Sequence, residues 1–190
     1  MSHSPSRSIT SALLGLLCLG LAGCPSDDEC GVGDAPANGL VASSTDVTIR
    51  YTNLTSLLGN DCPAMDAPDG VVSVSIEGQQ EGGTGLITLC IPRPDLLMQG
   101  NRSIGTSLSM ADVRIFDLMG SDDAGCTYTL DSTRPPSGTA TGSGVCKNGD
   151  DPAGFAIDLD AAVSLRRTCN GTTDSIAVTL VGRAAVARRQ

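Results

Sequence analysis

The sequence predicts an all-β domain, either an antiparallel β-sandwich or a β-barrel of about eight strands, stapled by disulfides. Three observations favour this fold class. Short segments with alternating apolar and polar residues recur along the chain, which is the pattern of half-buried strands. Turn signals rich in Gly, Pro, Asn and Asp separate them. Helix formers are scarce, because the 190 residues include only three Glu and one Lys.

The first half of the chain contains two alternating segments and a third segment that is more apolar. The first covers residues 47–51, and the next two, over 72–77 and 86–91, are expected to form a hairpin with a long polar connection. Residues 54–58 are expected to form a helical turn that ends at the Gly, Asn and Pro residues following it. Residues 93–110 hold several Ser residues and are interpreted as a surface loop.

The second half begins with a strand over residues 113–118. Two arms, 126–130 and 139–146, flank the turn Arg134-Pro135-Pro136-Ser137-Gly138 and are expected to pair with each other. Residues 147–154 are interpreted as a turn, and alternation then resumes over 155–160 and 163–165. Asn170-Gly171 is a strong hairpin signal. It precedes a last strand over 176–180 that is expected to extend through 185–187.

The first 23 residues have the three parts of a secretory leader. A polar start with Arg7 and no acid precedes an apolar run over 11–23 that ends in small residues. This run is shorter than the roughly 20 residues that a transmembrane helix needs. The sequence therefore predicts a leader that is cleaved.

The end of this leader, Leu21-Ala22-Gly23-Cys24, resembles the lipobox of bacterial lipoproteins. The resemblance implies that Cys24 carries a diacylglycerol, that the leader is cut before it, and that the new amino terminus receives an acyl chain such as palmitate. Two or more acyl chains anchor a protein stably to a membrane. The alternative is an ordinary signal peptide cut after Ala22, which leaves Cys24 as one more cysteine.

The cysteine count favours lipidation. Cys18 leaves with the leader, so ordinary cleavage leaves seven cysteines, whereas lipidation uses Cys24 and leaves six that can pair completely. Six cysteines allow 15 connectivities. The symmetric arms predict Cys126–Cys146, and Cys30–Cys62 and Cys90–Cys169 are the weaker suggestions for the rest. A metal site built from these cysteines is disfavoured, because no C-x-x-C spacing is present.

The composition argues against nucleic-acid binding. The whole chain has a net charge of −9, and the leader removes one Arg and no acid, so the mature chain carries −10. A polyanion such as DNA is repelled by this charge. The acidity favours solubility and does not identify a partner.

The sequence also argues against an enzyme. His3, the only histidine, lies in the leader, which removes the Ser-His-Asp triad, the Cys-His pair and the H-E-x-x-H zinc site. Carboxylate catalysis is the remaining route, with Asp158 and Asp160 on one strand face and with Asp122-Asp123 and Asp150-Asp151 as adjacent pairs. A glycosidase also needs a sugar platform, and the chain has no Trp, two Tyr and two Phe.

No cofactor is expected, although calcium is possible. Calcium binds six to eight oxygen ligands, and two acidic loops offer them without the EF-hand spacing. The candidate ligands are Asp61, Asp66, Asp69, Asp150 and Asp151.

Together these observations predict three parts: a leader over 1–23, a short tether over 24–29 with lipidated Cys24, and a single β domain over 30–190. The expected role is a non-catalytic structural or interaction role in the cell envelope or at the cell surface, and the expected location is the outer membrane of a Gram-negative bacterium. The alternative is a calcium- or glycan-binding module on a lipid tether. The expected partners are the membrane, through the lipid, and a protein or glycan of unknown identity.

Overall fold

The computed structural model describes residues 39–58, 62, 73–97, 100–107, 112–148 and 151–187. Over these residues the chain forms ten strands and one short helix. In chain order they are β1 (Gly39–Ser43), β2 (Thr48–Leu58), β3 (Val74–Gln80), β4 (Leu86–Ile91), α1 (Pro94–Leu97), β5 (Arg102–Ile104), β6 (Arg114–Ser121), β7 (Thr127–Leu130), β8 (Ser137–Asn148), β9 (Asp151–Cys169) and β10 (Thr172–Ala187).

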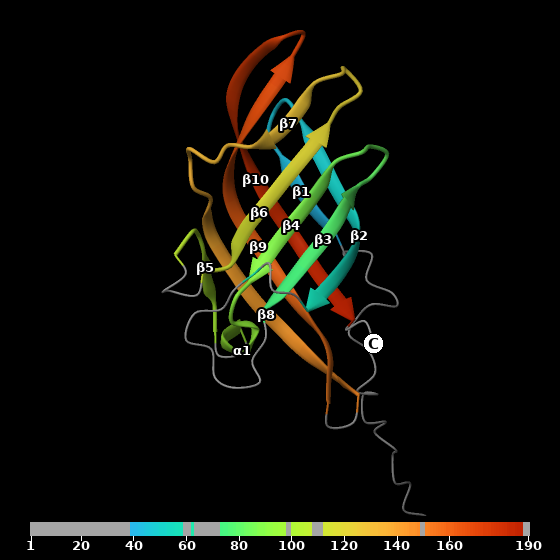
Figure 1. Cartoon of the computed structure of the whole chain (residues 1–190), viewed down its shortest axis with the longest axis vertical. Coiled ribbons are helices and arrows are strands. Elements are labelled where there is room, and N and C mark those ends of the chain that lie inside the picture. The colour runs from blue at the N-terminus through green and yellow to red at the C-terminus, as the bar shows by residue number, and fades with distance from the viewer. Residues whose placement is uncertain are drawn as a thin grey trace, which may run out of the picture.

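Eight of these strands close into an antiparallel β-barrel, which confirms the predicted fold class in its barrel form (Figure 1). The neighbours around the barrel are β10, β1, β2, β3, β4, β6, β7 and β9, and the pairing of β9 with β10 closes the ring. Of the remaining strands, β8 pairs with the first part of β9 on the same edge that β7 uses farther along, and β5 pairs with β8. Closure removes the exposed strand edges that an open sheet would leave.

The longest pairing in the barrel is the hairpin of β9 and β10. Its register runs from Thr172 opposite Cys169 to Ala187 opposite Gly154. The connection is the predicted turn, and both of its residues have positive φ, 50° at Asn170 and 78° at Gly171. Two central residues with φ above zero define the type I′ turn, whose twist matches that of the paired strands.

Apolar side chains from alternate residues of the strands fill the barrel interior. On β9 the side chains of Ile157, Leu159, Ala161, Val163 and Leu165 are all buried, because every second residue of a strand points to the same face. The aromatic residue at the centre is Tyr51 on β2, which is fully buried and donates a hydrogen bond to the Met119 carbonyl oxygen at 2.9 Å.

The seam between β1 and β10 depends on a close backbone approach. Gly182 has φ of +138°, and a Cβ at this position would collide with the carbonyl oxygen of Gly39 on β1. Glycine therefore allows β1 to lie against β10, because residues with a side chain rarely adopt this conformation.

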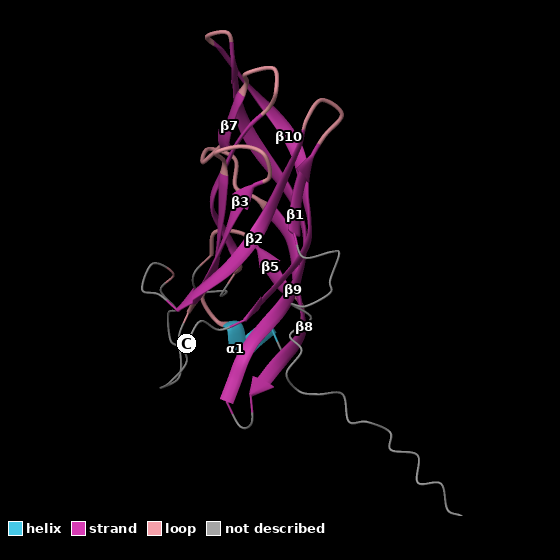
Figure 2. Ribbon diagram, turned by 90° about the vertical axis from the view of Figure 1, so that its right-hand side faces the viewer, coloured by secondary structure: helices cyan, strands magenta, loops and turns pink. Residues whose placement is uncertain are grey.

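Four turns gather at one end of the barrel, which we call the turn end (Figures 1 and 2). It consists of the β1–β2, β3–β4, β6–β7 and β9–β10 turns, residues 44–47, 81–85, 122–126 and 170–171. Helix α1 and the start of β9 lie toward the opposite end. No helix among the residues described is long and apolar enough to cross a membrane.

Several element predictions are confirmed. The hairpin expected from residues 72–77 and 86–91 is the β3–β4 pair, with Val74 opposite Ile91. The strands expected near 47–51, 113–118 and 176–180 are parts of β2, β6 and β10.

Other predictions are wrong. Residues 54–58 continue strand β2 instead of forming a helical turn. A bulge at Asn53 and Leu54, with Asn53 at φ 53°, shifts the register, and the pairing with β3 resumes at Thr55. The loop expected over 93–110 contains α1 and β5. The turn expected over 147–154 is shorter, since β8 runs to Asn148 and β9 starts at Asp151.

The pairing of the two arms was also predicted incorrectly. Strand β7 pairs with β6 and β9, and β8 pairs with β9 and β5. The physical reason is the length of β9, whose 19 residues accommodate β7 and β8 one after the other along the same edge. The predicted domain boundary at residue 30 lies outside the described residues.

One disulfide attaches Cys62, which lies between β2 and β3 in the chain, to the outer wall of the barrel. Cys62 is bonded to Cys90 on β4, and both residues are buried. Cys90 alternates with the inward-facing Leu89 and Ile91, so its side chain lies on the outer face. The Arg114 guanidinium lies 3.6 Å from the Cys90 sulfur. The bond shows that the predicted pairings Cys30–Cys62 and Cys90–Cys169 are wrong.

Candidate functional site

The interior of the barrel changes from apolar to polar at the turn end. The inward-facing series on β9 continues past Leu165 to Arg167, and the corresponding series on β10 begins with Asp174 before Ile176 and Val178. Arg167 is opposite Tyr128 of β7 on one side and opposite Asp174 on the other. Alternation therefore places a charged pair in the barrel mouth, directly above the apolar core.

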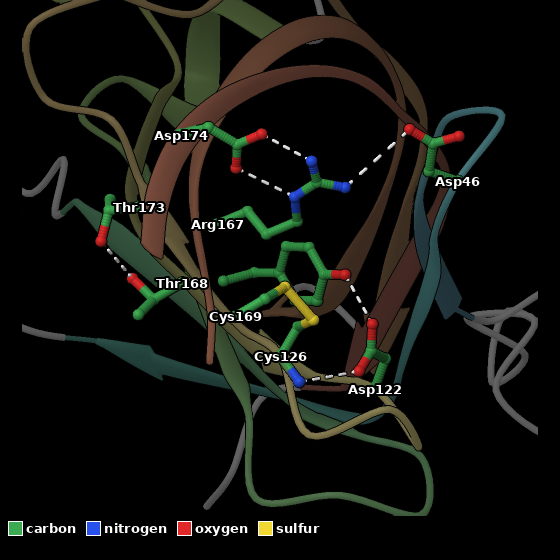
Figure 3. Close-up of a disulfide and its surroundings, with 9 residues drawn as sticks. Asp46, Asp122, Cys126, Arg167, Thr168, Cys169, Thr173 and Asp174 are labelled. Atoms are coloured by element: carbon green, nitrogen blue, oxygen red, sulfur yellow. Dashed lines mark hydrogen bonds and ion pairs between the residues drawn. A yellow bond between two sulfur atoms is a disulfide. The ribbon is translucent and has the colours of Figure 1, made fainter. Parts of the chain in front are cut away.

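Arg167 joins three parts of the mouth (Figure 3). Its guanidinium donates two hydrogen bonds to the Asp174 carboxylate, from Nε at 2.9 Å and from Nη2 at 2.5 Å. It also lies 3.9 Å from the carboxylate of Asp46, in the β1–β2 turn. The Arg167 side chain is 28% exposed and that of Asp46 is 64% exposed. A two-point contact between Arg and a carboxylate restricts the orientation of both groups.

Tyr128 lies at the boundary between this charged pair and the core. The residue is 2% exposed, and its hydroxyl donates a hydrogen bond of 2.6 Å to Oδ2 of Asp122 in the β6–β7 turn. Burial raises the pKa of Tyr128 to about 12, and the hydrogen bond to the Asp122 carboxylate acts in the same direction. The hydroxyl therefore stays protonated and serves as a donor at neutral pH.

The second disulfide closes the same region. Cys126 is bonded to Cys169 next to the β9–β10 turn, with a Cα–Cα distance of 4.5 Å. The pairing of Thr127 with Thr168 places these cysteines on neighbouring strands. The Cys126 amide donates to Oδ1 of Asp122 at 2.9 Å. The predicted Cys126–Cys146 bond is therefore wrong, because it assumed that β7 pairs with β8.

We call the residues Asp46, Asp122, Tyr128, Arg167 and Asp174, together with the Cys126–Cys169 bond, the mouth cluster. The cluster combines residues from the β1–β2 and β6–β7 turns with residues from β7, β9 and β10. Sequence reasoning did not single out its Arg167–Asp174 pair or Tyr128. A signal was present, since Arg167 falls at an inward-facing position of an otherwise apolar series.

A carboxylate outside the mouth cluster stabilises the loop that follows β7. Asp131 is buried, and its Oδ1 accepts hydrogen bonds from the Thr133 amide at 3.1 Å and the Thr133 hydroxyl at 2.7 Å. Its Oδ2 accepts a hydrogen bond from the Ser175 hydroxyl on β10 at 3.0 Å. The bonds from Thr133 hold the pKa of Asp131 below its usual value.

The predicted carboxylate pairs occupy different environments. Asp158 and Asp160 share the outer face of β9, as expected, but Asp158 accepts hydrogen bonds from Arg183 on β10 at 2.9 and 3.1 Å. Asp122 belongs to the mouth cluster, whereas Asp123 is exposed in the turn. The structure thus distributes these four acids between an ion pair, a hydrogen-bond network and solvent.

The predicted calcium ligands cannot be placed in this site. Asp61, Asp66, Asp69 and Asp150 lie outside the described residues, and the same holds for the side chain of Asp151. Within the part of the chain that is described, no group of three or more His, Cys, Asp or Glu side chains is arranged to hold a metal ion. Cys24 and Cys30 also precede the first described residue, and the Cys146 side chain is not described.

The hydrogen bonds within the mouth cluster keep its carboxylates in their ionised form. The hydrogen bond from Tyr128 lowers the pKa of Asp122, and that from Arg167 lowers the pKa of Asp174. A carboxylic acid that donates protons near neutral pH needs a raised pKa. These carboxylates are ionised hydrogen-bond acceptors, held in a fixed arrangement with one guanidinium.

We predict that acid destabilises the barrel through these carboxylates. A carboxylate whose pKa is lower in the folded chain contributes stability above its unfolded pKa, near 4, and this contribution is lost as the pH falls through the folded pKa. Asp122, Asp131 and Asp174 all belong to this class. Urea unfolding measured from about pH 6 to about pH 2 is therefore expected to give a decreasing free energy of unfolding.

Asp122→Asn tests the contribution of one group, because the amide does not titrate. Its single carbonyl oxygen keeps only one of the two hydrogen bonds that Asp122 accepts, from the Cys126 amide or from the Tyr128 hydroxyl. We expect this variant to lose less stability between neutral and acidic pH than the wild-type chain does. Asp123→Asn is the matched control in the same turn, since Asp123 is exposed, and its acid dependence should follow the wild type. Equal acid dependence in all three chains would contradict the assignment.

No family model, no curated protein and no solved structure matches the chain.

Proposed function

We propose that this chain is a lipid-anchored envelope protein that carries a closed β-barrel and uses the barrel mouth as a non-catalytic interaction surface. The observation that carries the proposal is Cys24 at the end of Leu21-Ala22-Gly23-Cys24, directly after the apolar leader. Two or more acyl chains would hold the protein at the membrane. The outer membrane of a Gram-negative bacterium is the location we propose.

The direction of β1 indicates how the barrel would be oriented relative to the anchor. The first described strand starts at Gly39 and runs toward the turn end, where residues 44–47 lead into β2. Strand β1 therefore enters the barrel from the side facing away from the mouth cluster. In this orientation, anchoring at Cys24 leaves the mouth cluster free to meet a partner.

The contacts within the mouth support an interaction role. Its carboxylates already accept hydrogen bonds from Tyr128 and Arg167, and the Cys126–Cys169 bond fixes the neighbouring strands. A preorganised charged surface reduces the entropy lost when a partner binds. Turnover of a polysaccharide panel by the purified chain, abolished in Asp122→Asn, would contradict the non-catalytic part of the proposal.

We predict that Cys24→Ala abolishes acylation completely. Cells expressing the wild-type chain are fed a labelled fatty acid, and the label is expected on the mature protein in the outer-membrane fraction. The Cys24→Ala chain is expected to carry no label, because it lacks the thiol that accepts the lipid. Cys18→Ala is the matched control, because Cys18 lies in the apolar run just before Cys24. This variant should be labelled as the wild type is.

Two results would overturn the anchor. One is a mature wild-type chain that begins before Cys24 and carries no acyl group, as measured by intact mass. The other is equal labelling of the Cys24→Ala and wild-type chains. Recovery of a labelled chain in the inner membrane would leave the anchor intact and contradict only the proposed location.

A further inference from the structure

We infer that Cys30 and Cys146 form a third disulfide, which ties the tether to the barrel at the end away from the mouth. The inference builds on the proposed lipidation, because Cys24 is then unavailable as a partner. Of the six other mature cysteines, Cys62 is bonded to Cys90 and Cys126 to Cys169. Pairing of all six therefore leaves one combination, where the sequence alone allowed fifteen.

The strand register brings the two cysteines within reach. Gly39 on β1 lies opposite Arg183 on β10, which lies opposite Asp158 on β9. Asp158 in turn lies opposite Thr141 on β8. These four residues form one row across four neighbouring strands, so about 14 Å separates Gly39 from β8 at this level.

Cys146 lies farther along β8, where it is opposite Gly154. Gly154 is four residues from Asp158 on β9, a distance of about 14 Å along the strand. Combining the two components places the Cys146 backbone about 20 Å from Gly39 along the sheet surface. Cys30 precedes Gly39 by nine positions along the chain, and nine extended residue-to-residue steps span about 30 Å.

The direction of the chain agrees with this distance. Strands β1 and β10 are antiparallel, with Gly39 opposite Arg183 and Ser43 opposite Thr179. Continuing β1 backward from Gly39 therefore follows β10 toward Ala187, which lies opposite Gly154 on β9. Cys146 pairs with the same Gly154, so β1 enters the sheet from the end at which Cys146 lies.

The bond forms by oxidation of two thiols. The Cys30 and Cys146 thiols together lose two protons and two electrons as the S–S bond forms, and a thiol–disulfide oxidoreductase in its disulfide form accepts them and becomes a dithiol. The same class of oxidant accounts for the two disulfides already described. The bond would leave six residues between the lipid and the first covalent attachment to the barrel, about 20 Å when extended.

Cleavage on the amino side of aspartate tests the bond directly. This cleavage places each of the six cysteines in a different peptide: 28–33, 61–65, 69–94, 123–130, 131–149 and 160–173. The full-length protein is extracted from its own membrane, its free thiols are alkylated without reduction, and the monomer from a non-reducing gel is digested. We expect peptide 28–33 to be linked to 131–149, while 61–65 with 69–94 and 123–130 with 160–173 serve as internal controls.

Alkylated Cys30 and Cys146 in the wild-type digest would overturn the inference, as would a bond from either residue to another cysteine. Cys146→Ser and Cys30→Ser provide a second readout, because each should expose one new thiol to a maleimide, whereas the double variant should expose none. The anchor is read separately from peptide 24–26. Loss of its acyl chains would contradict the proposed function, and the link between 28–33 and 131–149 would still report on the disulfide.

Discussion

Replacing both Cys126 and Cys169 by alanine is expected to lower the free energy of unfolding by about 4 kcal/mol, the chain-entropy value for a bond that closes a loop of this length. The bond spans 43 residues and joins β7 to the end of β9. Such a loss is a large part of the roughly 5–15 kcal/mol that stabilises a typical domain. Urea unfolding followed by circular dichroism measures it.

The loss should be concentrated at the barrel mouth. Strand β7 has four residues, and its pairs with β6 are limited to Met119, Gly120 and Ser121. Without the disulfide, hydrogen exchange of the β7 amides is expected to become faster than that of the neighbouring strands, because short segments with few paired residues open locally.

The pair Cys62 and Cys90 provides the matched control. Their bond spans 28 residues, so replacing both by alanine is expected to cost nearly as much, about 3.5 kcal/mol. This bond lies on the outer face of β4, away from β7, and amide exchange in β7 should remain close to the wild type. A cost below about 1 kcal/mol for the Cys126 and Cys169 variant would mean that the strand pairing alone holds β7 in place.

The fold class could be predicted because one face of nearly every strand is buried. The β3–β4 hairpin shows this, since Val74 and Ile76 face the core while Glu77 is exposed. Asn170-Gly171 predicted the β9–β10 hairpin, because these two residues readily adopt the positive φ values that its turn requires. Strand β1 was not predicted, because Gly39–Ser43 is short and contains Gly and Ala, which have low β propensity.

Disulfide connectivity could not be predicted from local pattern. The expected Cys126–Cys146 bond followed from two arms that are close in sequence, but these arms lie one after the other along the same edge of β9 and do not pair with each other. The length of one strand thus determined which cysteine became the neighbour of Cys126. Such non-local pairing is an outcome of the whole barrel and leaves no signature near the cysteines.

The mouth cluster was missed for the same reason. Asp46, Asp122 and Arg167 are far apart in sequence, and only barrel closure brings their elements together. The proposals for Cys24, for the calcium ligands and for the tether depend on residues outside the described structure. They remain predictions that follow from sequence.

The two tyrosines are expected to ionise well above the usual pKa of about 10, and to do so together with unfolding. Burial raises the pKa of Tyr51, with a further contribution from the charge of Asp117. Burial raises the pKa of Tyr128 to about 12. The raised pKa values contribute stability that is fully present below the unfolded pKa and is lost as the pH rises through the folded values.

The measurement is clean because the chain has two tyrosines and no tryptophan. We expect the ultraviolet absorbance of tyrosinate to stay low at about pH 10 in the folded chain, whereas both residues should titrate near that pH in concentrated denaturant. Tyr51→Phe leaves Tyr128 as the only reporter and is expected to show a midpoint near pH 12. Tyr128→Phe leaves Tyr51, whose ionisation should coincide with loss of the strand signal in circular dichroism.

These variants separate the core from the mouth. Tyr51→Phe also removes the part-buried hydrogen bond to the Met119 carbonyl, and the loss of one such hydrogen bond costs about 0.5–1.5 kcal/mol. Asp122→Asn in the Tyr51→Phe background should lower the midpoint of Tyr128, because the negative charge that opposes tyrosinate is gone. A Tyr128 midpoint near 10 with the fold intact would show that water reaches this hydroxyl freely. The mouth cluster would then not close the apolar core, and the preorganisation on which the proposed interaction surface rests would be absent.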